Sequence, residues 1–479
     1  MSTGKYEAVI GLEVHVQLNT QSKIFCSCRN RFGDRPNANT CPVCLGLPGS
    51  LPVLNRKVLE SAIKVGLALN CHVAERMKFD RKNYFYPDLP KAYQISQFDM
   101  PVSAKGYVDI MVNGEPKKIG ITRAHVEEDA GKLLHEGIKD GSNVDYNRTG
   151  TPLIEIVSEP DMRMPEEAYE YLTALKAILQ YLEVSDCNME EGSLRCDANV
   201  SIRPRGQKEF GVKAEIKNLN SFKAVARAIQ YEIDRQTDSI EEGDTVVQET
   251  RLWNDAKGVT TSMRSKEEAH DYRYFPEPDL VPFVISREIV SKIKATMPEL
   301  PRERQQRFVD TYGITVLDAA VLTQEKRLAD FYEETVACGS DPKAASNWIA
   351  NELLGQMKQR DLTIATLTIT PKAMANLIQI INKGLISGKI GKDVLGEMFS
   401  TDKLPEEIVK AKGLLQISDE GAIARVIDEV IAAHQKSVDD YRAGKKNALG
   451  FLVGQVMQKT KGKANPALVN KILTTKLEA

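Results

Sequence analysis

The feature that most constrains the fold is a change of hydrophobic period at Met297-Pro298-Glu299-Leu300-Pro301. Before this segment, apolar and polar residues alternate over short runs, as in half-buried strands. After it, apolar residues recur at helical spacing almost throughout. The pattern predicts an α+β domain over 1–295, an all-α helical domain over 296–412 and a helical tail domain over 413–479. A chain of 479 residues accommodates three domains at ~150 residues each.

Alternation is clearest in the segment 8–18. There Glu13, His15 and Gln17 share one face of a predicted strand, and Leu12 lies on the other face. Further strands are expected at 107–112, 119–127, 153–157, 198–203 and 211–216. Helices are expected at 165–182, which begins with a proline, and after Ser221, which can cap the helix.

Four cysteines stand close together in the pairs Cys26-Ser27-Cys28 and Cys41-Pro42-Val43-Cys44. The twelve residues between the pairs are rich in Arg, Asn, Gly and Pro, which is typical of a loop. Two tight turns can present four thiolates tetrahedrally, the arrangement that Zn²⁺ prefers. The alternative is that the four cysteines are buried or disulfide-linked and bind no metal. Because a closed Cys₄ site leaves no ligand position open, we expect this zinc to be structural.

Composition and charge argue against a membrane-spanning protein and against a protein that is positively charged over its whole surface. The net charge is −2, and no apolar run approaches the roughly 20 residues that cross a bilayer. The first residues run directly into a predicted strand, so we expect no signal peptide and a reducing cytoplasm. From His434 to Ala479 there are nine Lys/Arg and three Asp/Glu, a net of +6. This asymmetry favours nucleic-acid contact in the tail, although a merely solvated surface is the alternative.

Ionisable residues crowd into a few segments of the first domain, around 79–97, 122–132, 145–155, 190–199 and 213–221. Carboxylates, histidine and Arg/Lys gathered on one sheet suit Mg²⁺-nucleotide chemistry, because oxygen ligands hold Mg²⁺ and cations stabilise phosphoryl charge. The sequence has no Walker P-loop, no G-x-G-x-x-G after a strand and no G-x-S-x-G elbow. It also lacks a Gly/Ser-rich amidase stretch, and without that stretch or a G-x-S-x-G elbow we expect no hydrolytic nucleophile in this chain.

The same segments resemble the B subunits of the bacterial glutamyl/aspartyl-tRNA amidotransferase family, in order and over nearly the whole chain. The matching motifs lie at 10–15, 80–97, 125–132, 150–161, 190–199, 213–221, 248–251, 271–279, 450–455 and 462–466.

The resemblance implies a cradle domain like that of glutamine synthetase, with ATP and Mg²⁺ as cofactors. The protein would phosphorylate the side-chain carboxylate of Glu on tRNA(Gln) or Asp on tRNA(Asn), and ammonia would then displace phosphate. A glutaminase, the A subunit of the family, would supply the ammonia. The small C subunit would complete a heterotrimer, with no membrane partner. The missing amidase nucleophile agrees with this division of labour.

The resemblance also assigns roles to individual residues of this sequence. The positions that match Mg²⁺ ligands are Glu13, His15, Glu128 and Glu215. The expected metal or nucleotide contacts beside them are Glu127, Glu155 and Asp197, and the expected phosphate or substrate contacts are Lys82, Arg195 and Lys217. For the tail we expect RNA contacts from Lys445, Lys446, Lys459, Lys461 and Lys463.

Two other functions remain open from the sequence. One is a non-catalytic tRNA-binding scaffold, which the crowded carboxylates argue against, because acids repel tRNA phosphates unless a cation intervenes. The other is an independent ATP-dependent amidoligase, which would need an ammonia source without a partner. The sequence does not distinguish Glu-tRNA(Gln) from Asp-tRNA(Asn) as the substrate.

Overall fold

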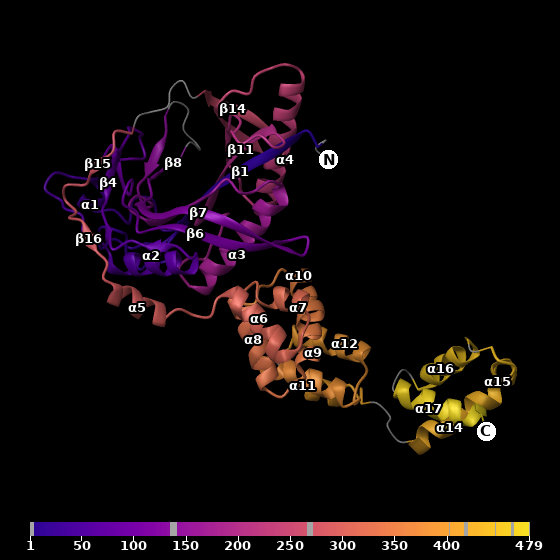
Figure 1. Ribbon diagram of the computed structural model, residues 1–479. Coiled ribbons are helices and arrows are strands. Elements are labelled where there is room, and N and C mark those ends of the chain that lie inside the picture. Colours follow the sequence, from indigo (N-terminus) through magenta and orange to yellow (C-terminus); the bar gives the residue numbers. More distant parts are fainter. Residues whose placement is uncertain are drawn as a thin grey trace. The chain divides into compact units, whose positions relative to one another are not determined.

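The computed structural model describes residues 4–134, 141–265, 272–401, 403–415, 420–445, 447–460 and 464–478. The chain divides into two compact units, Met1–Leu300 and Pro301–Ala479 (Figure 1). The first unit is mixed α/β with a large sheet and the second is helical, which confirms the predicted change of architecture. Buried apolar residues form three clusters, over 6–293, 308–409 and 423–477. The division into three domains stays a prediction.

One large sheet forms the centre of the first unit. Its strands are β1 (Tyr6–Gln17), β2 (His72–Val73), β6 (Ser103–Val112), β7 (Glu115–Glu128), β10 (Pro152–Ser158), β11 (Leu194–Pro204), β12 (Ala214–Lys217), β13 (Glu249–Asn254) and β14 (Val259–Ser265). They pair in the order β14-β13-β12-β11-β1-β10-β7-β6-β2. Neighbours are antiparallel except β12 and β13, which are parallel and are connected through α4 (Phe222–Glu241). The first strand of the sequence thus lies inside the sheet, between two strands that come much later.

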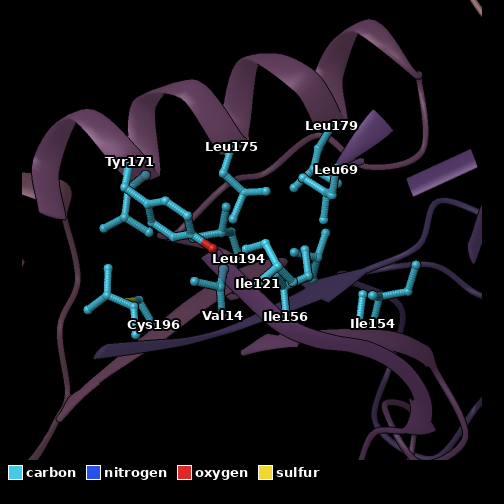
Figure 2. Packing of buried hydrophobic residues seen from close by; sticks show 14 of the residues in the cluster. Val14, Leu69, Ile121, Ile154, Ile156, Tyr171, Leu175, Leu179, Leu194 and Cys196 are labelled. Atoms are coloured by element: carbon cyan, nitrogen blue, oxygen red, sulfur yellow. The ribbon is translucent and has the colours of Figure 1, made fainter. Parts of the chain in front are cut away.

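One face of this sheet is apolar and packs against helices. In Figure 2, Leu175 and Leu179 of α3 (Pro165–Tyr181) point onto Val14, Ile156 and Leu194 of the sheet. All five side chains are fully or almost fully buried, and each such burial stabilises the fold by about 1.5–3 kcal/mol. Since side chains alternate along a strand, the odd-numbered residues of β1 are left to the opposite face.

The second covering helix, α4, begins as the sequence predicts. Oγ of Ser221 accepts a hydrogen bond from N of Ala224 at 3.1 Å, which caps the first turn. Its buried residues include Val225, Ile229 and Ile233, which repeat at helical spacing and face the apolar cluster of the first unit. The predicted cap is confirmed.

Smaller elements surround the large sheet. The short strands are β3 (Arg76–Met77), β4 (Asp80–Asn83), β5 (Tyr93–Ser96), β8 (Lys132–Leu134), β9 (Asn143–Asp145), β15 (Phe275–Pro276) and β16 (Phe283–Val284). They form the sheets β15-β4-β5, β16-β3 and β8-β9. The remaining helices of this unit are α1 (Pro42–Leu45), α2 (Arg56–Ala68) and α5 (Arg287–Ala295).

The second unit is built from helices. They are α6 (Pro301–Tyr312), α7 (Val316–Leu322), α8 (Lys326–Ala337), α9 (Pro342–Asn347), η2 (Trp348–Leu353), α10 (Leu354–Gln359), α11 (Pro371–Asn382), α12 (Gly388–Met398), α13 (Pro405–Ala411), α14 (Glu420–Ala433), α15 (Gln435–Arg442), α16 (Asn447–Lys459) and α17 (Pro466–Glu478). The segment 316–337 contains two helices, α7 and α8, because Glu325 has an extended backbone and starts α8. None of the helices within the described residues is long and apolar enough to cross a bilayer.

Candidate functional site

The face of the large sheet opposite α3 carries a row of polar side chains from four adjacent strands. Residues that stand opposite each other in antiparallel strands share a face, so the register determines which side chains meet. His125 of β7 stands opposite Glu155 of β10, and Glu155 stands opposite His15 of β1. His15 in turn stands opposite Arg195 of β11. The sheet therefore brings together residues that are far apart in the chain.

Three side chains on this face come close enough to share one ion. Ligand atoms of His15, Glu127 and Glu155 all lie within 4.8 Å of one another. Nδ1 of His15 is 3.4 Å from Oε1 of Glu127. A second imidazole, His125, places Nε2 at 3.3 Å from Oε2 of Glu155 and 3.8 Å from Oε2 of Glu127. These four residues are called the His–Glu cluster below.

Charge attraction holds the His–Glu cluster together against the cost of burial. Burial alone would lower the pKa of His125, but the carboxylates of Glu127 and Glu155 outweigh it and raise that pKa to about 9. Burial is likewise outweighed at His15, whose pKa is raised by Glu127. Burial also opposes the charge of Glu127 and Glu155, yet the imidazoles keep the pKa of each carboxyl below its usual value. Both carboxylates are therefore ionised at neutral pH, the state that binds a cation.

A second group of charges continues on the same face toward β12. Nζ of Lys217 lies 2.7 Å from Oδ2 of Asp197 and 3.1 Å from Oε1 of Glu215. Oγ1 of Thr250 donates to Oε2 of Glu215 at 2.9 Å. Burial would raise the pKa of Glu215, but Lys217 and this hydrogen bond lower it. Lys217 and Glu215 are thus held in their charged forms beside Asp197.

Glu13 joins the two groups along β1. It stands opposite Asp197, and it shares a strand face with His15 two residues later. Nδ2 of Asn199 donates to Oε1 of Glu13 at 2.9 Å, which orients the carboxylate. The polar face is therefore continuous from the His–Glu cluster to Lys217.

Arg195 has hydrogen-bonding capacity that the described residues leave unused. Its Nη2 donates to Oδ2 of Asp129 at 2.9 Å, and Nε2 of Gln17 donates to the same oxygen at 2.9 Å. Nε of Arg195 is buried and has no hydrogen-bond partner among the described residues. Such a donor beside a carboxylate cluster suits an anionic ligand.

Lys82 approaches the site from β4 between aromatic rings. Its Nζ lies 4.7 Å from the ring centroid of Tyr272 and 5.8 Å from that of Tyr84. Burial would lower the pKa of Lys82, but the charge of Glu127 raises it above the usual value. Lys82 is therefore a fixed cation facing the His–Glu cluster.

Glu128 points away from the His–Glu cluster. It directly follows Glu127, and successive strand residues face opposite sides. Its Oε1 accepts from N of Ile95 at 2.9 Å and pairs with Nζ of Lys91. To join a metal on the polar face, this side chain would have to leave both partners.

The structure thus separates the four residues predicted to bind magnesium. His15 belongs to the His–Glu cluster, whereas Glu13 and Glu215 lie in the neighbouring charged group and Glu128 contacts Lys91. Their role as magnesium ligands stays a prediction.

The four cysteines converge, as their spacing predicts. Sγ atoms of Cys26, Cys28, Cys41 and Cys44 all lie within 4.8 Å of one another. N of Cys41 donates to Sγ of Cys44 at 3.0 Å. A hydrogen bond from Cys26 lowers the pKa of Cys44 to about 5, whereas burial raises the pKa of Cys28 to about 11. Four sulfur donors at this separation, one already favouring the thiolate, fit a tetrahedral Zn²⁺ ion.

The tail lysines are only partly described. Lys446, Lys461 and Lys463 lie outside the described residues. Nζ of Lys445 lies 2.9 Å from Oδ1 of Asp440, and Lys459 pairs with Glu429. The side chains of Lys445 and Lys459 remain substantially exposed, so they can still reach a ligand. Their carboxylate partners reduce the positive potential that the sequence count implies.

Several partners of the site were not among the predicted site residues. They are His125, Asp129, Asn199 and Thr250. The spacing of His125 and Glu127 on one strand was a usable signal, since residues two apart share a face. Thr250 gave no signal, because its contact with Glu215 depends on the parallel pairing of β12 with β13.

Two family models match this chain. Residues 8–291 match the family described as the GatB/GatE catalytic domain, and residues 330–477 match the family described as the GatB domain. The first match contains the cysteine loop and every residue of the polar face named above.

Curated relatives are similar over nearly the whole length. The B subunit of an aspartyl/glutamyl-tRNA(Asn/Gln) amidotransferase from Carboxydothermus hydrogenoformans is 61% identical over 476 residues, which is 99% of each chain. Proteins of the same name from Thermoanaerobacter pseudethanolicus and Brevibacillus brevis are 59% identical over 473 residues and 56% identical over 469 residues. These matches cover 99% and 98% of both chains, respectively.

Proposed function

This chain belongs to the family of aspartyl/glutamyl-tRNA(Asn/Gln) amidotransferase B subunits, and from that premise we propose that it is the ATP-dependent component of such an enzyme. It phosphorylates the side-chain carboxylate of Glu-tRNA(Gln), Asp-tRNA(Asn) or both, and the activated carbonyl is then amidated by ammonia from a partner. Activation is needed because a carboxylate is a poor acyl donor, whereas phosphate is a good leaving group.

The observation that carries the proposal is the close approach of His15, Glu127 and Glu155 on the polar face of the sheet. Two ionised carboxylates and an imidazole offer donors for a divalent cation, and carboxylate oxygens are what Mg²⁺ prefers. Bound there with ATP, Mg²⁺ would neutralise phosphate charge during phosphoryl transfer. His125 would hold both carboxylates in place from the protein side.

Three cations on or beside the polar face are suited to the anionic reactants. Nε–H of Arg195 is buried without a partner in the described part of the chain, Lys82 is held between tyrosine rings, and Lys217 bridges two carboxylates. We assign to them the orientation of the substrate carboxylate and of the transferred phosphoryl group. Glu13, Asp197 and Glu215 complete the proposed metal and nucleotide contacts, and Glu128 is retained as a predicted magnesium ligand.

A structural Zn²⁺ ion in the Cys₄ site is part of the proposal. Cys26, Cys28, Cys41 and Cys44 would bind it as thiolates, and it would link the two ends of the loop between them. The charged polar face lies on other elements, so zinc is assigned no step in the reaction.

Partners and location follow from the proposed reaction. A glutaminase partner, the A subunit, would generate ammonia, and the small C subunit would complete a heterotrimer. The helical tail, from about 413 to 479, would bind the tRNA body with its lysines. For the first unit we propose the glutamine synthetase-like cradle that the resemblance implies, because that fold performs the same acyl-phosphate amidation. A cytoplasmic location fits tRNA substrates and free cysteines.

The competing function is a tRNA-binding scaffold without chemistry of its own. Burying two ionised glutamates with His125 is costly, and a scaffold has no use for them. A reconstitution of the chain with both partner subunits separates the two. We expect ATP hydrolysis and amidation that depend on Glu-tRNA(Gln) or Asp-tRNA(Asn). Tight tRNA binding with no tRNA-dependent ATP turnover would reject the proposal in favour of the scaffold.

A further inference from the structure

Glu215 of β12 has both of its carboxylate oxygens engaged by neighbouring side chains. Oε1 lies 3.1 Å from Nζ of Lys217, and Oε2 accepts a hydrogen bond from Oγ1 of Thr250 at 2.9 Å. We propose that Thr250 is a positioning residue for the reaction, because its hydroxyl fixes the carboxylate of Glu215 in one orientation as a metal or nucleotide contact. The inference rests on the proposed ATP-dependent function and adds to it a residue of β13, the strand beyond β12 in the sheet.

Thr250 reaches Glu215 through the pairing of two parallel strands. Glu215 stands opposite Thr250 in the ladder of β12 and β13, and opposite Asn199 in the ladder of β11 and β12. Residues that stand opposite each other share a face of the sheet, so Thr250 belongs to the polar face. The polar face therefore continues from β12 onto β13.

A hydroxyl suits this position because it orients a carboxylate without neutralising it. Asn199 does the same for Glu13, since its Nδ2 donates to Oε1 of Glu13 at 2.9 Å. Two carboxylates of the polar face thus each receive an uncharged donor from the adjacent strand, and each keeps its negative charge for a cation. Loss of a group that holds a metal ligand in this way typically costs about 10- to 100-fold in metal affinity or activity.

The strand that carries Thr250 is held in place by a buried network. Arg251, the next residue, donates from Nε to Oγ1 of Thr260 at 2.7 Å, and Oγ1 of Thr260 donates to Oε2 of Glu232 at 3.3 Å. Glu232 belongs to α4, is completely buried, and also accepts from Nε2 of Gln236 at 2.8 Å. The ladder of β13 with β14 shifts register between Thr250 and Arg251, an irregularity that is common beside functional sites. Thr250 therefore lies on a fixed strand, as the support of a functional side chain requires.

A strand threonine with a satisfied hydroxyl can also be purely structural, and two substitutions separate the roles. Valine keeps the branched shape and the β-propensity of threonine but has no hydroxyl, whereas serine keeps the hydroxyl and loses the methyl group. A structural role depends on the branched side chain. A positioning role depends on the hydroxyl alone.

The test uses the reconstituted complex with Thr250→Val, Thr250→Ser, Glu215→Ala and the double variant Thr250→Val/Glu215→Ala. We measure the Kd for Mn²⁺ by electron paramagnetic resonance, with a non-hydrolysable ATP analogue present, and the kcat and KM of tRNA-dependent ATP turnover. Thr250→Val should weaken Mn²⁺ binding about tenfold or more and lower kcat/KM for ATP, and Thr250→Ser should recover most of that loss. In the Glu215→Ala background, Thr250→Val should change the Mn²⁺ affinity less than about twofold, because the hydroxyl acts through Glu215.

Thr261→Val is the matched control and should leave both measurements unchanged, because Thr261 is exposed on the adjacent strand β14. Thermal unfolding checks that each variant folds, and Thr250→Ala repeats the test if the valine variant does not. Unchanged Mn²⁺ affinity and turnover in Thr250→Val would overturn the inference. A loss in Thr250→Ser as large as in Thr250→Val would do the same, as would normal Mn²⁺ binding in Glu215→Ala or a full further loss in the double variant. Absence of tRNA-dependent ATP turnover in the unaltered complex would instead reject the proposed function.

Discussion

Glu127 and Glu128 are neighbours on β7, yet their carboxylates lie on opposite sides of the strand. Glu127 contacts two histidines on the polar face, whereas Glu128 pairs with Lys91 away from that face. Both are almost completely buried, at 3% and 2% exposure. They are therefore a matched pair of test positions, with the same residue type, the same strand and the same burial.

Glu127→Gln should abolish most of the amidation activity. The change removes one anionic donor from the His–Glu cluster, and we expect a loss of at least ~100-fold, because phosphoryl charge is no longer neutralised. Direct titration with Mn²⁺ should show weaker metal binding. Glutaminase activity of the complex should persist, since that chemistry belongs to the partner. Normal metal affinity and normal amidation in this variant would remove Glu127 from the site.

Glu128→Gln should act mainly on stability. Breaking a buried ion pair leaves Lys91 charged without a partner, which destabilises a protein by about 3–5 kcal/mol. A lowered midpoint in denaturant unfolding, with Mn²⁺ affinity close to that of the unaltered protein, is the expected result. If Mn²⁺ binding weakens as much as in Glu127→Gln, the magnesium role predicted for Glu128 gains direct support.

The stability of the metal-free protein should fall at high pH through His125. Its pKa is about 9 in the folded protein and about 6.5 when unfolded, so its contribution is fully present below about pH 6.5 and is lost as the pH rises through 9. The carboxyl groups of Glu127 and Glu155 have lowered pKa values in the folded protein. Their contribution to stability is therefore present above about pH 4.5 and is lost on acidification. Thermal unfolding with EDTA should show a smaller decline between about pH 7 and 10 in His125→Gln. An identical decline in both proteins would contradict the assignment.

The cysteine cluster should carry about one zinc per chain by metal analysis. Cys41→Ser should release the metal and lower Tm, because a closed tetrahedral site needs all four donors. The effect on the ATP-dependent step should be smaller than the effect on stability. Cys338→Ser, at an exposed cysteine outside the cluster, is the control. Full zinc in a Cys26/Cys41 double serine variant would show that the metal is held elsewhere.

Deletion of the residues after Leu415 should weaken tRNA binding and reduce its dependence on salt. Each lysine–phosphate contact that is lost lowers the slope of log K against log salt by about one. Charge reversal of Lys459 should give a partial effect, because Glu429 already pairs with it. Reversal of Lys372 in α11 is the control. Unchanged affinity and slope after deletion would make the tail a stability module.

Local patterns predicted much of this molecule, and long-range pairing explains what they missed. The alternation in β1 placed Glu13, His15 and Gln17 on one face. The spacing of the four cysteines predicted that their sulfur atoms converge. No local pattern states that β1 lies between β10 and β11, so the meeting of His15 with Glu155 and Arg195 required the register.

The assignment of Glu128 rests on a different kind of evidence. Its grouping with His15 came from motif resemblance, which preserves the order of residues but does not state which side of a strand each one faces. Strand alternation separates it from Glu127, and that rule applies wherever the strand assignment is right. The period of two over residues 125–128 places Glu128 on the other side of the strand, and its role as a magnesium ligand stays a prediction.

The central place of β1 has a consequence for how the chain matures on the ribosome. Tyr6–Gln17 is made first, but its two neighbours end only at Ser158 and Pro204. At roughly 5–20 residues per second, the strand waits about 10 to 40 s before both of its edges can pair. During that time a run containing Val9, Ile10 and Leu12 is available to wrong partners. A nascent chain stalled before Pro204 should therefore depend on chaperones, and a chain stalled well after it should not.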